Sequence, residues 1–231
     1  MMMLDHPSGG SRRIFWAVPL DETVRSLVAS ACRDMKKTMS FRNWTHPEDY
    51  HITLIFLGET ADKDIPAIIR AAQDVAARHA PFCLCLSGPG TFGGGGGKGG
   101  SGARGPSQFP APRVLWFGVE GDRNRLARLQ KDLSDAHEPL GYKPERRPYS
   151  PHITVARKGN HPLPNPLPNP LNLLRGQPNP EADPAAKCSP APASKPSPEP
   201  CWEVRRIILY ETRMGHSPMY KELAVLPLGS G

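Results

Sequence analysis

The sequence contains two copies of one short motif, His-Ile-Thr followed by an aliphatic residue, at His51–Leu54 and at His152–Val155, which begin 101 residues apart. In each copy the histidine and the threonine are two residues apart within an apolar, β-branched run, which is the alternation of a half-buried strand. We therefore predict that the histidine and the threonine of each copy share one face of a strand. An imidazole exchanges a proton near neutral pH, and a hydroxyl can hold an anionic oxygen. Two such strands facing each other would place an acid/base pair around a phosphate.

The first motif predicts which side chains lie on the other face of its strand. Strict alternation assigns His51 and Thr53 to one face and assigns Ile52, Leu54 and Phe56 to the other. The second motif follows the same pattern. The strand of the first motif is expected to end near the glycine at position 58.

The same order of elements occurs twice along the chain. Strands predicted at Ile14–Val18 and Arg113–Val119 begin 37 and 39 residues before the two motif histidines. Between strand and motif, Asp21 and Asp122 can each cap a helix with an apolar stripe at helical spacing. Nearly equal spacing in both halves indicates an internal duplication.

These elements predict an α+β fold with two similar antiparallel-sheet lobes, helices on the outer faces and a central cleft between the motif strands. Further elements are expected as a helix from about residue 62 and as strands at 82–87, 202–210 and 220–226.

Composition divides the chain into ordinary globular sequence and three other segments. We expect residues 1–11 to form a disordered tail and residues 12–231 to form a single bilobal domain. This domain carries a Gly-rich loop at 88–112 and a Pro-rich insertion at 158–201, which we expect to be mobile and partly extended. The loop contains a G-x-G-x-x-G match at Gly88–Gly93, but no helix pattern follows, so a dinucleotide site is not predicted.

Charge and cysteine content bear weakly on partner and compartment. A formal net charge of +7 favours an anionic partner such as RNA. The five cysteines show no spacing typical of a disulfide framework, and neither a signal peptide nor an apolar run of membrane-spanning length is evident. We therefore expect a monomer in a reducing cytoplasm without membrane association, with Cys83 and Cys85 buried in the core rather than binding a metal.

Metal catalysis is a competing interpretation of the paired histidines. His-x-Thr supplies only one good ligand per strand, and no carboxylate or cysteine falls at the usual ligand spacing beside either histidine. We predict no catalytic metal and no cofactor.

In these motifs and their order, the chain resembles the two-histidine phosphoesterase superfamily and, within it, the RNA 2′,3′-cyclic phosphodiesterases that are also described as 2′-5′ RNA ligases. The resemblance covers most of the globular sequence in five blocks that occur in the expected order. These blocks lie at residues 13–20, at 43–44 together with 51–58, at 112–116, at 151–157, and at 209–212 together with Tyr220. The Gly-rich loop and the Pro-rich insertion depart from the family pattern.

The resemblance implies hydrolysis of RNA 2′,3′-cyclic phosphate ends to a 2′-phosphate, with weak 2′-5′ joining as the reverse reaction. It implies His51 as general acid toward the O3′ leaving group and His152 as general base for water, a direction that the residues alone leave open. Thr53 and Thr154 would bind the non-bridging phosphate oxygens, and Arg157 would contact the phosphate. Strict alternation turns Arg157 away from His152, so the strand must end or bulge before it.

Two other functions stay open at this point. One is a phosphodiesterase acting on a small cyclic nucleotide or on a nucleotide-sugar cyclic phosphate. The other is a non-catalytic RNA-binding module on the same scaffold, although binding alone does not require two titratable groups.

Overall fold

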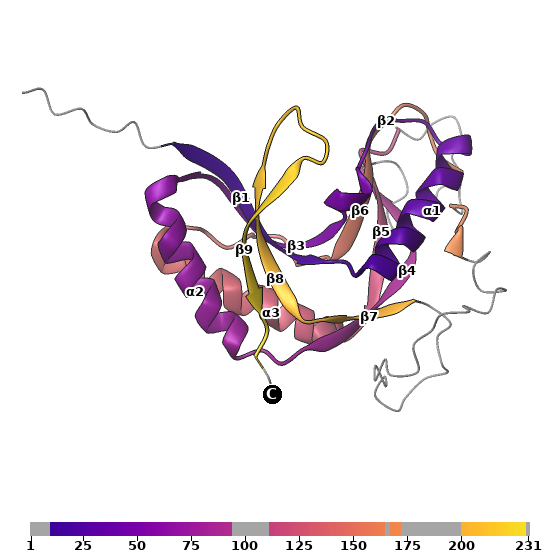
Figure 1. Ribbon diagram of the computed structural model, residues 1–231. Coiled ribbons are helices and arrows are strands. Elements are labelled where there is room, and N and C mark those ends of the chain that lie inside the picture. Colours follow the sequence, from indigo (N-terminus) through magenta and orange to yellow (C-terminus); the bar gives the residue numbers. More distant parts are fainter. Residues whose placement is uncertain (1–9, 94–110, 165–166, 172–199, 230–231) are drawn as a thin grey trace, which may run out of the picture.

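The computed structural model describes residues 10–93, 111–164, 167–171 and 200–229 (Figure 1). The elements within these residues are, in chain order, β1 (Ser11–Pro19), α1 (Glu22–Thr38), β2 (Phe41–Trp44), the 3-10 helix η1 (Pro47–Asp49), β3 (His51–Ala61), η2 (Asp62–Asp64), α2 (Ile65–Ala77), β4 (Phe82–Phe92), β5 (Val114–Gly121), α3 (Arg123–His137), η4 (Glu138–Leu140), β6 (His152–Gly159), β7 (Cys201–Val204), β8 (Arg206–Thr212) and β9 (Tyr220–Pro227).

The strands form one continuous sheet in the order β7-β4-β5-β6-β3-β1-β8-β9, and β2 pairs with β6 beside this path. Every pairing is antiparallel, and the sheet curls into a half-barrel (Figure 1). One lobe contains β3, β1, β8 and β9, and the other contains β6, β5, β4, β7 and β2. The register joins the lobes at a single residue pair, Ile52 opposite Ile153. The predicted α+β, bilobal fold is confirmed, and its two lobes meet edge to edge at the two motif strands.

The three helices all pack on the same face of the sheet. The buried residues of α1, α2 and α3 belong to one apolar cluster together with sheet residues such as Trp16, Ile52 and Ile153. Helix α3 follows β5 but contacts the other half of the chain, because Trp16 Nε1 in β1 donates to His137 Nε2 at 3.2 Å. Helix α1 follows β1 but ends beside β2 of the other lobe, where Lys36 Nζ lies 5.3 Å from the centroid of the Trp44 ring. The duplicated halves therefore exchange helices, which binds the two lobes together.

The helix that we expected after Asp21 begins as predicted. The Asp21 carboxylate accepts a hydrogen bond from Val24 N at 2.7 Å, which satisfies one of the free amides of the first turn of α1. Asp122 precedes α3 but caps nothing, because its carboxylate accepts from Cys83 N of β4 at 3.1 Å instead. The local sequence predicted where both helices begin, but only α1 has the predicted hydrogen bond to its capping carboxylate.

The three segments set apart by composition are partly ordered. β1 begins at Ser11, within the expected tail, and the expected Gly-rich loop begins as a strand, because residues 88–92 complete β4. Of the Pro-rich insertion, Lys158 and Gly159 complete β6 and Cys201 begins β7. The remaining parts of these predictions, at 1–9, 94–110, 165–166 and 172–199, lie outside the described residues.

The first part of the Pro-rich insertion is packed against the core instead of extending away from it. Its repeated Leu-Pro-Asn-Pro sequence places leucines four residues apart, and Leu163 and Leu167 pack partly buried against the main apolar cluster. Leu171, the next in this spacing, is buried. Burial of each leucine side chain contributes on the order of 1–2 kcal/mol, which fastens this stretch to the domain.

The strand that we expected at 202–210 is two strands in different lobes. β7 pairs with β4, whereas β8 pairs with β1 and β9. Arg205 lies between them, so the chain passes from one lobe to the other at this residue. β3 likewise differs from the prediction, because it continues through Gly58, which has a φ of +74°, to Ala61.

The prediction that Cys83 and Cys85 are buried in the core is wrong, and cysteines that we expected to be free form disulfides. Cys85 in β4 and Cys201 in β7 form a disulfide between directly opposite residues of neighbouring strands, and Cys83 is also disulfide-bonded. Cys83 and Cys85 are both partly exposed rather than buried in the core. Within the described residues, no helix has the length and apolar character needed to cross a membrane.

Candidate functional site

The junction between the lobes brings both motifs onto one face of the sheet. Ile52 and Ile153 are directly opposite each other and fully buried, so their side chains point to the helix-covered core. The residues on either side of them point to the opposite face, which we call the histidine face. In an antiparallel pair this register places His51 toward Thr154 and Thr53 toward His152. The four side chains therefore surround one residue pair on the histidine face, and all four are partly exposed.

Both imidazoles are held by the same backbone contact. His51 Nδ1 lies 2.7 Å from the carbonyl oxygen of Asp49, and His152 Nδ1 lies 2.7 Å from the carbonyl oxygen of Ser150. A carbonyl only accepts, so each Nδ1 carries the proton in the neutral ring and each Nε2 is left with a lone pair. The duplication thus fixes the same tautomer twice, using the residue two positions before each histidine.

In β6 the strand bulges three residues after the histidine. The register with β5 passes from Thr154 to Ala156 and leaves Val155 without a partner. Because an extra residue reverses the alternation, Arg157 returns to the face that carries His152. The bulge that we expected before Arg157 is present. Arg157 is exposed, and its positive charge contributes to lowering the pKa values of both motif histidines.

In β3 an equivalent bulge corrects one prediction. The register with β1 passes from Thr53 to Ile55 and leaves Leu54 without a partner, again three residues after the histidine. Phe56 is therefore on the histidine face instead of the core face, opposite Phe15 in the register. The Phe56 side chain is 58% exposed, and its ring centroid lies 5.2 Å from that of Phe15. Phe56 occupies in β3 the position that Arg157 occupies in β6.

The first histidine is enclosed by aromatic rings. The ring centroids of Phe15, Tyr220 and Tyr210 lie 4.9, 5.1 and 6.1 Å from that of His51. His51 Nε2 lies 3.1 Å from Thr53 Oγ1. Removal from water lowers the pKa of His51 to about 4, and the positive charges of Arg157 and His152 add to this lowering. His51 is therefore neutral at pH 7 when no anion is bound.

The second histidine has different neighbours. The ring centroids of Phe92 and Trp116 lie 4.9 and 6.2 Å from that of His152. Burial lowers the pKa of His152, and the nearby charge of Arg157 lowers it further. Trp116 is opposite Thr154 in the register, and its indole N–H is buried without a hydrogen-bond partner among the described residues. The His152 side of the site thus differs from the His51 side in holding a cation, Arg157.

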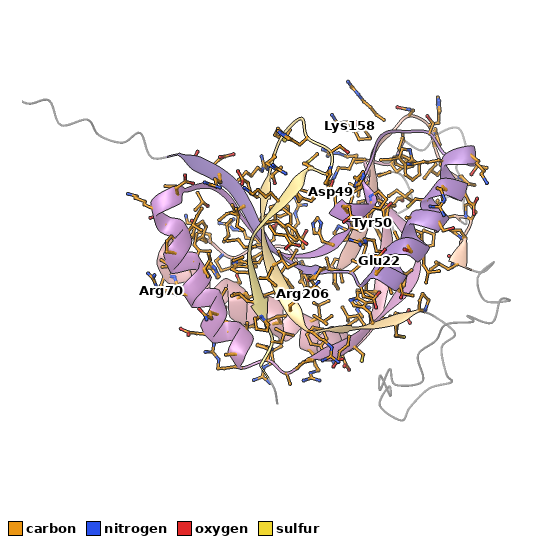
Figure 2. The ribbon with its side chains drawn as sticks, in the orientation of Figure 1. Glu22, Asp49, Tyr50, Arg70, Lys158 and Arg206 are labelled. Carbon is orange, nitrogen blue, oxygen red and sulfur yellow. A yellow bond between two sulfur atoms is a disulfide. The ribbon has the colours of Figure 1, made fainter. Side chains whose placement is uncertain are left out.

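Asp49 organises the His51 side, and the sequence reasoning did not identify it. Its buried carboxylate accepts from Met219 N at 2.9 Å and from Tyr220 N at 3.0 Å, while its carbonyl holds His51. Figure 2 shows Asp49 near the middle of the molecule. Asp49 therefore positions both the His51 imidazole and Tyr220, whose ring packs edge-on against that imidazole. The sequence held no local signal for this role, because the partners of its carboxylate are about 170 residues away in the chain.

The arrangement suits proton transfer at an anion. Two imidazole lone pairs, two hydroxyls and one guanidinium share a face, which is the set needed to move protons on either side of a phosphate and to bind its oxygens. Among the described residues, no three His, Cys, Asp or Glu side chains come together as a metal site would require. The predicted roles of His51, Thr53, His152, Thr154 and Arg157 stay predictions.

Comparison with known proteins places this chain in a family. Residues 40–215 match the model of the 2′-5′ RNA ligase superfamily. A Geobacillus stearothermophilus protein named RNA 2′,3′-cyclic phosphodiesterase is 34% identical over 93% of this chain and 56% of its own length. A Bacillus subtilis (strain 168) protein of the same name is 32% identical over 62% of this chain and 70% of its own. The crystal structure of TT0787 from Thermus thermophilus superimposes with a TM-score of 0.60 at 26% identity, covering 94% of this chain and 98% of that one.

The chain therefore belongs to the 2′-5′ RNA ligase superfamily. It spans little more than half the length of the Geobacillus stearothermophilus relative.

Proposed function

We propose that this protein hydrolyses RNA ends that carry a 2′,3′-cyclic phosphate and leaves a 2′-phosphate. The observation that carries the proposal is the pair of motif histidines, which share one face of the sheet and one tautomer around the Ile52–Ile153 pair. Family membership and the names of the relatives support the substrate class.

In the proposed mechanism, His152 Nε2 removes a proton from the attacking water, and a protonated His51 gives its proton to the departing O3′. Attack and departure take place on opposite sides of phosphorus, which requires two separate proton carriers. Thr53, Thr154 and Arg157 bind the non-bridging oxygens, whose negative charge grows in the transition state. With a 5′-hydroxyl in place of water, the same two proton transfers form a P–O5′ bond while the P–O3′ bond breaks, which joins two strands through a 2′-5′ linkage. We therefore also propose weak 2′-5′ ligation.

In the proposed mechanism, His51 becomes protonated only when the substrate is bound. Because its pKa is lowered to about 4, His51 is almost fully neutral at pH 7 in the free protein. The negative charge of a bound cyclic phosphate stabilises the imidazolium and raises this pKa. Both motif histidines have lowered pKa values, so both limbs of the pH profile of kcat/KM, which reports the free protein, should lie below about pH 6.5. The profile of kcat, which reports the complex, should be shifted to higher pH.

The reaction is proposed to need no metal, because imidazoles, hydroxyls and a guanidinium carry out every step. We also propose that the protein acts as a monomer in the cytoplasm, without membrane association.

The test is to incubate the purified protein with an oligoribonucleotide that ends in a 2′,3′-cyclic phosphate, with and without a chelator, and to identify the product end. We expect a terminal 2′-phosphate in both cases. A terminal 3′-phosphate would contradict the proposed direction of opening, and loss of turnover in chelator that one divalent metal restores would contradict metal independence. Binding of the oligonucleotide without turnover would identify a non-catalytic RNA-binding module instead.

A further inference from the structure

Three cations of neighbouring strands lie side by side at one end of the second lobe. β2 and β6 pair with Phe41 opposite Gly159 and Asn43 opposite Arg157, which leaves Arg42 next to Lys158. On the other side of β6, Lys158 N donates to Arg113 O, just before β5, at 2.9 Å. Strands in a sheet are about 4.8 Å apart, so these three backbone positions span roughly 10 Å. We call them the cation row: Arg42, Lys158 and Arg113.

Within the described residues, the cation row has no acidic partners. All three residues are exposed, and none of the ion pairs within the described part of the chain includes any of them. Like charges on neighbouring strands destabilise a sheet, by roughly 0.2–1 kcal/mol for directly opposite pairs. A row of three cations without a carboxylate thus opposes folding and suits an anion that arrives from outside.

Lys158 adds a separate sign of functional constraint. Its φ is +59°, and no other non-glycine residue of the described chain has a positive φ. This left-handed conformation is unfavourable for a residue with a Cβ, and glycine adopts it freely. The next residue in the chain is a glycine, yet the strained position holds a lysine. Figure 2 shows Lys158 at the rim of the molecule, where β6 ends.

The cation row lies at the end of β6, one residue beyond the site described above. Arg157, whose charge contributes to lowering the pKa values of both motif histidines, directly precedes Lys158 in the chain. The cation row therefore crosses the ends of β2, β6 and β5 next to Arg157 along the backbone.

We propose that the cation row binds the phosphodiester backbone of the RNA next to its cyclic-phosphate end, so that the protein acts on oligonucleotide ends in preference to single nucleotides. This inference rests on the proposed function. Three flexible cations about one strand spacing apart suit the repeated phosphates of a single strand, and a lone cyclic nucleotide has no second phosphate to reach them. A surface of this kind contributes affinity that falls with salt and does not depend on sequence.

The experiment compares two substrates, adenosine 2′,3′-cyclic phosphate and a short RNA of about eight nucleotides with a 2′,3′-cyclic phosphate end, a length that spans several phosphates. The variants are Arg42→Gln, Arg113→Gln, Lys158→Gly and the triple combination. The matched control is Arg70→Gln, which removes one exposed charge from α2 on the other lobe (Figure 2).

Each single variant should raise KM for the RNA about fivefold at about 0.1 M salt, and the triple variant should raise it about 100-fold. The reason is that each lost phosphate contact reduces the slope of log affinity against log salt concentration by about 0.7. KM for the mononucleotide should stay within about twofold, as should both KM values of the control. Lys158→Gly should also raise the thermal unfolding temperature, since it relieves the strained φ while it weakens RNA binding. An unchanged KM for RNA in the triple variant would overturn the proposal.

Direct binding separates this proposal from the proposed function. If neither substrate is hydrolysed, the proposed function fails, and fluorescence anisotropy with a 3′-phosphate-ended RNA of the same length then tests the cation row alone. A weaker affinity of the triple variant for this RNA, with a smaller salt slope, supports the proposal. An RNA affinity equal to that of the unmodified protein overturns it, and a selective loss of affinity for a glutamate peptide of equal charge would assign the surface to an acidic protein partner.

Discussion

The two motif strands have the same backbone design and different surroundings. In both β3 and β6 the imidazole is held by the carbonyl two residues earlier, and the strand bulges three residues later. The residue that this bulge returns to the histidine face is Phe56 in one lobe and Arg157 in the other. His51 lies among Phe15 and two tyrosines, whereas His152 lies beside Phe92 and a tryptophan.

Under the proposed mechanism, this difference gives the two copies of the repeated unit different roles. The backbone repeats the tautomer and the direction of each ring, which any proton carrier on this face needs. The surroundings then decide how readily each ring holds a proton and where the anion sits. Arg157 places a cation on the strand that carries His152. Burial among aromatic rings lowers the pKa of His51, so protonation of His51 depends on the negative charge of a bound substrate in the proposed mechanism.

The largest expected effect comes from removing either imidazole. His51→Ala and His152→Ala should each lower kcat by about 10²- to 10⁴-fold, because each replacement removes one proton carrier. Steady-state kinetics on the cyclic-phosphate RNA gives the loss, and circular dichroism checks that the fold is retained. Full activity in either variant would reject the assigned pair.

A modified substrate then distinguishes acid from base in the same two variants. A cyclic phosphate with sulfur in place of the bridging O3′ has a leaving group that needs little protonation. His51→Ala should recover at least about tenfold of its loss on this substrate if it is the acid, and His152→Ala should not. Recovery in His152→Ala alone would reverse the two roles.

The residues after the two bulges should differ in effect by an order of magnitude or more. Arg157→Ala should lower kcat/KM about 100-fold, because a cation at the growing phosphate charge acts mainly in the transition state. Phe56→Ala should change kcat/KM less than about tenfold, since its exposed ring bears no charge. Kinetics of both variants on one substrate checks this difference, and equal losses would mean that the two positions act alike.

The residues two positions before the histidines should differ in stability. Asp49→Ala leaves the amides of Met219 and Tyr220 without an acceptor and should lower the free energy of unfolding by about 2–4 kcal/mol. Ser150→Ala keeps the carbonyl that holds His152, and its exposed side chain should matter by less than about 0.5 kcal/mol. Urea unfolding measures both values. A tolerated Asp49→Ala would show that the loop joining β8 and β9 is held by other contacts.

The smallest effect is a pH dependence of stability. A histidine whose pKa is lowered by folding binds fewer protons in the folded state than in the unfolded state. The free energy of unfolding should therefore fall as the pH falls from about 6.5 to about 4, by at most about 3 kcal/mol from His51. Urea unfolding at several pH values should show a shallower dependence in His51→Gln. An identical dependence in this variant would place the effect elsewhere, for example at His137, whose pKa burial also lowers.

Most of the secondary structure could be predicted because its signals are local. The apolar periodicity of the helices, the cap at Asp21 and the alternation in both motifs depend on residues within one or two turns of each other. The duplicated order of elements predicted two lobes for the same reason. The bulge before Arg157 was predictable, because strict alternation turned this residue away from His152 while its implied phosphate contact required the same face. Phe56 follows His51 by the same five residues as Arg157 follows His152, so the same bulge could have been expected in β3.

Local pattern was enough to establish that two His-x-Thr strands exist and that one face of each is polar. Three-dimensional packing was needed to establish that these strands meet at Ile52 and Ile153, that residues 202–210 divide between lobes and that Asp49 reaches a segment about 170 residues away. Strand register, ring burial and the resulting pKa values depend on which segments far apart in the chain come into contact. That selection is made by the packing of the whole core, which no local pattern contains.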